Sequence, residues 1–240
     1  MKSIIWLLVL FTAGLPLVAQ ENPDPVEPED PAPVVVKPKP VKPDAVREYK
    51  AKRYSEAIAI CLNEIKETPG NRYSYIVLGW SLIAQGKYSE AFDYTRMGID
   101  RTGSDQYLIE NAEESLTKLY AWFYNQGRYD DALPAIQRFI SYLPNSTKVP
   151  TAYALLGDIY LKKGQYIYAD TALSYALRSN PNAFEWWLGA GLAREKFGDY
   201  KSALAAYGEA LKLDPSHQEA LRGRDRMREK LSLAVSPAAP

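Results

Sequence analysis

Small and apolar residues recur at a regular spacing along most of this chain. The stretch QGKYSEA at residues 85–91 has counterparts at residues 51–57, 126–132, 163–169 and 197–203. Each copy has a tyrosine that is followed three residues later by an alanine, and in four of the five copies a glycine stands two residues before the tyrosine. Glycine readily takes the left-handed conformation that ends a helix. The pattern therefore predicts the same helix–turn–helix hairpin five times.

Two further positions share this period. With the tyrosine numbered 17 in each repeat, position 8 is glycine in three repeats, and position 32 is proline in four. The glycines are Gly79, Gly157 and Gly191, and the prolines are Pro69, Pro144, Pro181 and Pro215. A small residue at position 8 allows two helices to approach closely, and a proline stops the second helix. Because one hairpin cannot bury its own apolar stripe, we expect successive hairpins to stack.

The spacing and residue types resemble those of the tetratricopeptide repeat family, whose signatures are W-x2-L-G-x2-Y, A-x3-F and a final P. The resemblance covers residues 38–217 and implies an all-α solenoid, a right-handed superhelix of antiparallel helix pairs with about five repeats. We place the solenoid at 44–217. The repeats are expected near 38–71, 72–105, 113–146, 150–183 and 184–217. The first helix of repeat 1 should be short and begin near Asp44, because prolines occupy its first turns.

Departures from the regular spacing predict local changes. Successive tyrosines lie 34, 41, 37 and 34 residues apart. The seven extra residues before repeat 3 equal about two helical turns, so they should lengthen its first helix, over 105–126, without rotating the apolar face. The three extra residues before repeat 4 fit a loop ahead of Pro150. Residues 218–234 are predicted to form a capping helix, and 235–240 a disordered tail.

The first 43 residues differ in composition from the repeats. Lys2, an apolar run from Ile4 to Phe11 and small Ala19 predict a signal peptide over residues 1–19. Eight of the 17 prolines lie within residues 23–43, so 20–43 should be an extended polyproline linker. Two alternatives remain open. A cleaved signal predicts an exported, periplasmic protein, whereas an uncleaved one would anchor the chain in the inner membrane. The Pro-Lys segment, which resembles spacers of the envelope-spanning TonB kind, would then serve as a tether.

Composition excludes several classes of function. The chain is 47% apolar and 24% charged with a formal net charge of zero, so we expect no nucleic-acid partner, and a membrane only if the signal segment is retained. His217 is the only histidine, which excludes hydrolytic triads and histidine metal clusters. Cys61 stands where the family places phenylalanine, so the resemblance implies a buried filler. We expect no enzyme activity, no metal and no cofactor.

The family resemblance implies a binding surface on the concave wall, which positions 2, 5, 9, 12 and 13 of each first helix line. Chaperone-binding members hold a terminal carboxylate with lysine at position 5 and asparagine at position 9. In repeat 2 these places hold Ile76 and Trp80, and the other repeats also lack the pair, so no carboxylate clamp is expected. The candidate partner-binding residues are Tyr73, Ile76, Trp80, Tyr124, Asp158, Leu161, Lys162 and Leu188.

Large aromatic residues provide much of the binding energy at many interfaces, so Tyr73, Trp80 and Tyr124 are the candidate anchors. Trp80 has an alternative role in packing on repeat 1. Trp122 and Trp187 are expected to pack in the core. The sequence thus predicts a non-catalytic protein–protein interaction scaffold in the bacterial envelope, which binds a peptide or helix of a partner protein in its concave groove.

Overall fold

The computed structural model describes residues 44–235, in which all regular secondary structure is helical. The helices of this part are α1 (Ala45–Lys50), α2 (Tyr54–Glu67), α3 (Arg72–Ala84), α4 (Tyr88–Thr102), α5 (Gln106–Asn125), α6 (Tyr129–Tyr142), α7 (Val149–Lys162), α8 (Tyr166–Ser179), α9 (Phe184–Phe197), α10 (Tyr200–Leu213) and α11 (Gln218–Val235). The predictions for residues 1–43, and for the tail beyond 235, lie outside the described residues.

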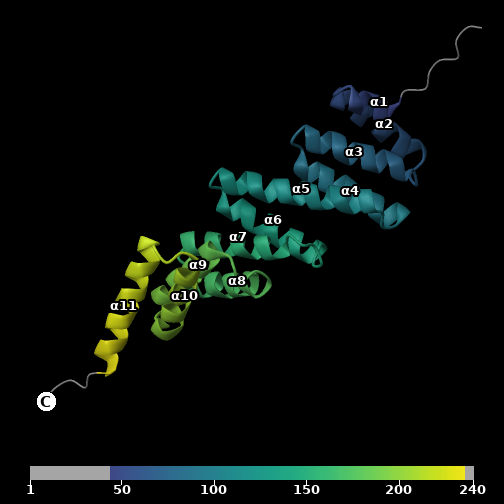
Figure 1. The fold of residues 1–240 in the computed structure, drawn as a ribbon. Coiled ribbons are helices and arrows are strands. Elements are labelled where there is room, and N and C mark those ends of the chain that lie inside the picture. The colour runs from purple at the N-terminus through teal and green to yellow at the C-terminus, as the bar shows by residue number, and fades with distance from the viewer. Residues whose placement is uncertain (1–43, 236–240) are drawn as a thin grey trace, which may run out of the picture. The chain divides into compact units, whose positions relative to one another are not determined.

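Each repeat is a pair of packed helices, from α1 with α2 to α9 with α10. Each pair also packs on the next pair along the chain (Figure 1). The predicted all-α solenoid of stacked hairpins is therefore confirmed. The predicted capping helix is α11, which contacts both α10 and α9. Within the described part, none of the helices has the length and apolar character that a membrane span needs.

The turns between paired helices have the predicted backbone conformation. Gly86, Gly127, Gly164 and Gly198 have φ angles of 75°, 69°, 70° and 92°. Repeat 1 has a lysine at this place, and Lys52 takes the same left-handed conformation with a φ of 60°. A side chain at this φ is strained, so we conclude that the hairpin geometry overrides the local preference of the residue.

The small residues at position 8 do allow close approach of the paired helices. A Cβ atom added at Gly157 would lie 2.5 Å from Cγ of Leu173 and 3.3 Å from the carbonyl oxygen of Ala169. An added Cβ at Gly191 would lie 2.9 Å from the ring of Tyr207. Any larger residue at these positions would push the helices of a hairpin apart.

The irregular spacings have the predicted structural effects. Helix α5 has 20 residues, against 13 in α3, so the extra residues form additional turns. Pro150 lies in the first turn of α7, where its missing N–H costs no hydrogen bond. Helix α1 has only six residues, and the Asp44 side chain caps it by accepting hydrogen bonds from the backbone N–H groups of Val46 and Arg47.

Two of the three core predictions for single residues are confirmed. Cys61 is fully buried, and burial raises the pKa of its thiol to about 12. Trp187 is half-buried, and its indole N–H donates a 2.7 Å hydrogen bond to the carbonyl of Pro181. The prediction for Trp122 is wrong, because its side chain is 45% exposed. It lies against Phe123 and the guanidinium of Arg128 near the end of α5.

Candidate functional site

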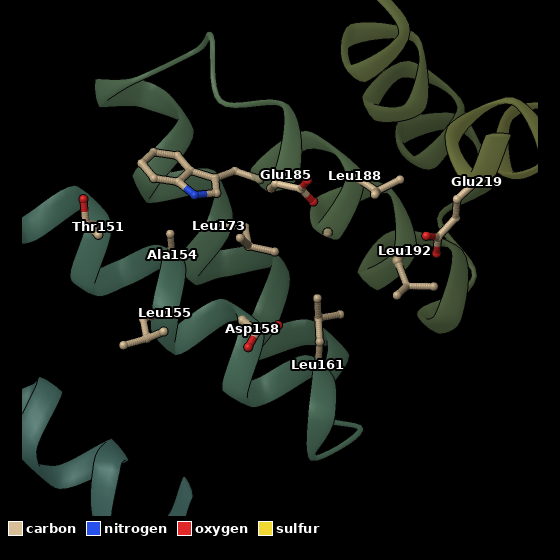
Figure 2. A pocket seen from close by; sticks show the side chains of 12 residues that line it. Thr151, Ala154, Leu155, Asp158, Leu161, Leu173, Glu185, Leu188, Leu192 and Glu219 are labelled. Carbon is tan, nitrogen blue, oxygen red and sulfur yellow. The ribbon is translucent and has the colours of Figure 1, made fainter. Parts of the chain in front are cut away.

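A pocket of about 360 Å³ lies between the first helices of repeats 4 and 5 (Figure 2). Helices α7 and α9 provide most of its walls, with single residues from α8 and α11. The lining residues are Thr151, Ala154, Leu155, Asp158, Leu161, Leu173, Glu185, Trp186, Leu188, Gly189, Leu192 and Glu219. The pocket thus opens on the face where the sequence predicts the groove.

Small residues account for the space. Gly189 has no side chain, and a Cβ atom built there would lie 3.1 Å from Cδ1 of Leu173 and 3.4 Å from Cδ1 of Leu161. Ala154 contributes only a methyl group from the facing helix. With larger residues at these positions, α7 and α9 would fill the pocket with their own side chains.

The two main walls are similar in character. Figure 2 shows Ala154, Asp158 and Leu161 in succession along α7, and Glu185, Leu188 and Leu192 in succession along α9. The leucines are partly exposed, so their side chains form an apolar surface that a ligand can reach. Apolar walls with a few polar groups are typical of ligand pockets, whose volumes are roughly 300–1,000 Å³.

Asp158 is held in place by two other candidate residues. The Tyr124 hydroxyl donates a 2.5 Å hydrogen bond to Oδ2 of Asp158, and Nζ of Lys162 lies 2.6 Å from Oδ1. Burial and this bond to the carboxylate raise the pKa of Tyr124. Burial lowers the pKa of Lys162, but the ion pair with Asp158 outweighs this and leaves it raised. Three of the candidate residues, Tyr124, Asp158 and Lys162, therefore contact one another, and the Tyr124 hydroxyl is bonded within the chain.

The three candidates of helix α3 lie apart from the pocket. Tyr73 is 77% exposed and does not line it. Trp80 packs against Tyr49 of α1 and, edge to face, against Tyr107 of α5, with ring centroids 5.6 and 6.1 Å away, as its alternative role in packing requires. The groove prediction for Ile76 needs correction, because its side chain is only 3% exposed.

The lengthened helix α5 explains why Ile76 is buried. Leu108, in the extra turns at the start of α5, belongs to the same cluster of buried side chains as Ile76. Those turns lie against α3 and cover a surface that would face the groove in a regular repeat. Of the eight candidates, Asp158, Leu161 and Leu188 line the pocket. Tyr124 and Lys162 do not line it, but both bind the side chain of Asp158.

The sequence prediction missed several functional candidates, among them Trp186, Gly189 and Glu219. Trp186 and Gly189 lie on α9, at positions between those expected to face the groove. Glu219 lies in the first turn of α11, and it corresponds to position 2 of a further repeat whose first helix is α11. Counting the capping helix as a first helix would have found Glu219. Within residues 44–235, no group of three or more histidine, cysteine, aspartate or glutamate side chains is arranged to hold a metal ion.

Residues 123–166 and 154–218 match the family model described as tetratricopeptide repeat. These residues therefore carry tetratricopeptide repeats. Among curated proteins, it is similar to the human protein O-mannosyl-transferase TMTC1, with 27% identity over 194 residues, which are 76% of this chain and 20% of that protein. The chain therefore spans about one fifth of the length of this relative.

Solved structures of several repeat domains are similar to the chain. The first TPR domain of Spaghetti (RPAP3), bound to the HSP90 peptide SRMEEVD, has 19% identity and a TM-score of 0.46, covering 50% of this chain and 93% of that one. The second TPR domain of human RPAP3, in complex with the HSP70 peptide SGPTIEEVD, has 19% identity and a TM-score of 0.43, covering 47% and 92%. YrrB, a TPR protein with an unusual peptide-binding site, has 17% identity and a TM-score of 0.45, covering 75% and 88%.

Proposed function

We propose that this chain is a non-catalytic adaptor that binds a peptide or helical segment of a partner protein in the pocket between α7 and α9. The observation that carries the proposal is the open pocket of about 360 Å³ on the first-helix face of two adjacent repeats. Its walls are mainly leucine side chains, and its rim has three carboxylates. A few polar groups around an apolar surface suit the recognition of a protein side chain.

The chemistry of the lining favours binding over catalysis. Asp158 is engaged by Tyr124 and Lys162, and Thr151 is the hydroxyl residue of the lining. The Cys61 thiol is buried elsewhere, in the core around α2 and α3, and its raised pKa keeps it protonated. The pocket therefore offers surfaces and charges to a partner, and no activated nucleophile.

Two double variants test the binding site. Leu188→Ala with Leu192→Ala removes much of the apolar wall, whereas Ile167→Ala with Tyr168→Ala removes side chains at least as large from the exposed face of α8, outside the pocket. Peptides selected on the wild-type protein from a displayed random library should lose affinity by at least about tenfold for the first variant, since each lost anchor costs about 1 kcal/mol or more. They should retain affinity for the second. Unchanged affinity for the first variant would contradict the site.

We further propose that the adaptor works in the periplasm or at the inner membrane of a bacterial envelope. This proposal rests on Lys2 and the apolar run from Ile4 to Phe11, which are typical of an export signal. Mass spectrometry of the native N-terminus separates the two locations. A chain that begins at Gln20 supports a free periplasmic adaptor, and one that retains Lys2 to Ala19 supports an anchored tether.

A further inference from the structure

The charged side chains that line the α7–α9 pocket are all acidic. Three of the lining residues are acidic, namely Asp158, Glu185 and Glu219, and the lining contains no lysine or arginine. Lys162 beside the pocket neutralises Asp158. Among the described residues, Glu185 and Glu219 have no ion-pair partner within 4.0 Å. Two exposed carboxylates at the rim are thus available to a ligand.

From this arrangement we infer that the bound segment carries lysine or arginine residues that flank a bulky aliphatic residue. The inference rests on the proposed function and names the chemical class of the partner at the same site. Figure 2 shows Leu188 between the two carboxylates, Glu185 in the first turn of α9 and Glu219 in the first turn of α11. A ligand side chain packed on Leu188 would therefore have a negative charge on either side.

An aromatic side chain adds a second reason for a cation. Trp186 is half-buried, lines the same pocket and follows Glu185 directly in α9. The face of an indole ring attracts lysine and arginine within about 6 Å of its centre, most strongly among the aromatic side chains. Glu185 and Trp186 therefore each favour a basic group on the ligand.

The same charges act against acidic partners. A peptide that ends in acidic residues would place its carboxylates beside Glu185 and Glu219, and the lining contains no basic side chain to offset the repulsion. Negative charge in the first turn of a helix also stabilises the helix itself. This effect of the glutamates on helix stability does not depend on the ligand. Peptide probes of equal length that differ in charge therefore distinguish it from recognition of the ligand.

Four fluorescein-labelled peptides test the inference on the folded protein. Three have the cores Lys-Ala-Leu-Ala-Lys, Gln-Ala-Leu-Ala-Gln and Glu-Ala-Leu-Ala-Glu, and the fourth replaces the leucine of the first with serine. Fluorescence anisotropy measures their dissociation constants at low and at high salt. The lysine probe should bind about tenfold more tightly than the glutamine probe, with a smaller difference at high salt. The glutamate and serine probes should bind more weakly than the lysine probe.

Variants that remove the same charge at different sites show which carboxylates bind the lysine probe. Glu185→Gln with Glu219→Gln should weaken the lysine probe about tenfold and leave the glutamine probe unchanged. Glu56→Gln with Glu90→Gln makes the same charge change in the first turns of α2 and α4, outside the pocket, and should leave all probes unchanged. Thermal melting followed by circular dichroism reports whether both double variants fold.

The possible outcomes separate the two proposals. If the three leucine probes bind equally well, the inference about basic residues is overturned, while loss of binding in Leu188→Ala with Leu192→Ala would still support the pocket. Equal loss of the lysine probe in both glutamine double variants would also overturn the inference, since the effect would then come from net charge. If no probe binds at about 1 mM protein, both proposals are overturned.

Discussion

The side-chain amide of Asn111 donates a 3.0 Å hydrogen bond to the main-chain carbonyl of Ile76, 35 residues earlier in the chain. Asn111 is 1% exposed and lies in the extra turns of α5, and Gly79 of α3 leaves the space that its amide occupies. A Cβ atom at Gly79 would lie 2.5 Å from Nδ2 of Asn111. The glycine at position 8 of repeat 2 thus accommodates a polar contact with the next repeat as well as the packing of its own hairpin.

Replacing Asn111 with aspartate should strongly destabilise the protein. The change keeps the shape but places a carboxylate oxygen against the carbonyl of Ile76, in a buried site where an unpaired charge is costly. We expect a loss of about 3 kcal/mol or more in the free energy of unfolding, measured by urea denaturation. Asn125→Asp is the matched control, because Asn125 is exposed at the end of the same helix, and it should change stability by less than about 0.5 kcal/mol.

Two glycine-to-alanine substitutions should change stability in opposite directions. Gly208 lies inside α10 with no atom within 4 Å of an added Cβ, so alanine should stabilise the protein by about 0.5–1 kcal/mol through its higher helix propensity. Gly223 lies inside α11, where an added Cβ would come 2.5 Å from Cζ of Tyr207. There the clash should outweigh the propensity and destabilise by about 1–3 kcal/mol. Chemical denaturation measures whether the free energy of unfolding of each variant rises or falls. A stabilising Gly223→Ala would contradict the packing of α11 on α10.

The docking of α11 should weaken at acidic pH. The Arg226 guanidinium donates hydrogen bonds of 2.9 and 2.8 Å to Glu195, and the Tyr207 hydroxyl donates one of 2.7 Å. The bonds from Arg226 lower the pKa of Glu195 below its usual 4.5, against the opposing effect of burial. A carboxyl group whose pKa is lowered by folding stabilises the native state above its unfolded pKa, and this contribution disappears as the pH falls through the lower, folded value.

The free energy of unfolding measured between about pH 6 and pH 3 tests this dependence. Wild-type stability should fall below about pH 4.5, and Glu195→Gln should be less stable at pH 6 but should lose less on acidification. Glu209→Gln, which changes a partly exposed residue of α10 that pairs with Lys212, should keep the wild-type slope. Equal slopes in Glu195→Gln and the wild type would show that this carboxyl group is not responsible.

The Cys61 thiol should be inert in the folded protein. Burial, with a smaller effect of Glu64, raises its pKa to about 12, so very little thiolate is present at pH 8. Ellman's reagent should react only as fast as the chain opens, and the full signal of one thiol should appear at once in denaturant. A fast reaction under native conditions would contradict the placement of Cys61 in the core.

Sequence spacing by itself determined the hairpins of this protein. The glycine turns, the stop of four of the second helices before proline and the lengthened α5 depend on residues close together in the chain, and the local backbone preferences of glycine and proline contribute to them. The prolines that precede Asp44 likewise predicted the start of α1, and the structure adds that the Asp44 side chain caps this helix. These features were therefore predictable without the tertiary structure.

Tertiary structure alone decided which of the predicted groove residues are accessible. The extra turns of α5 bring Leu108 to the core around Ile76 and Tyr107 to Trp80, so part of the expected surface of α3 is covered. The pocket forms farther along, where Gly189 leaves space and α11 contributes Glu219. The physical reason is that side-chain exposure depends on how helices of different repeats pack, and the combined volumes of residues far apart in the chain determine that packing.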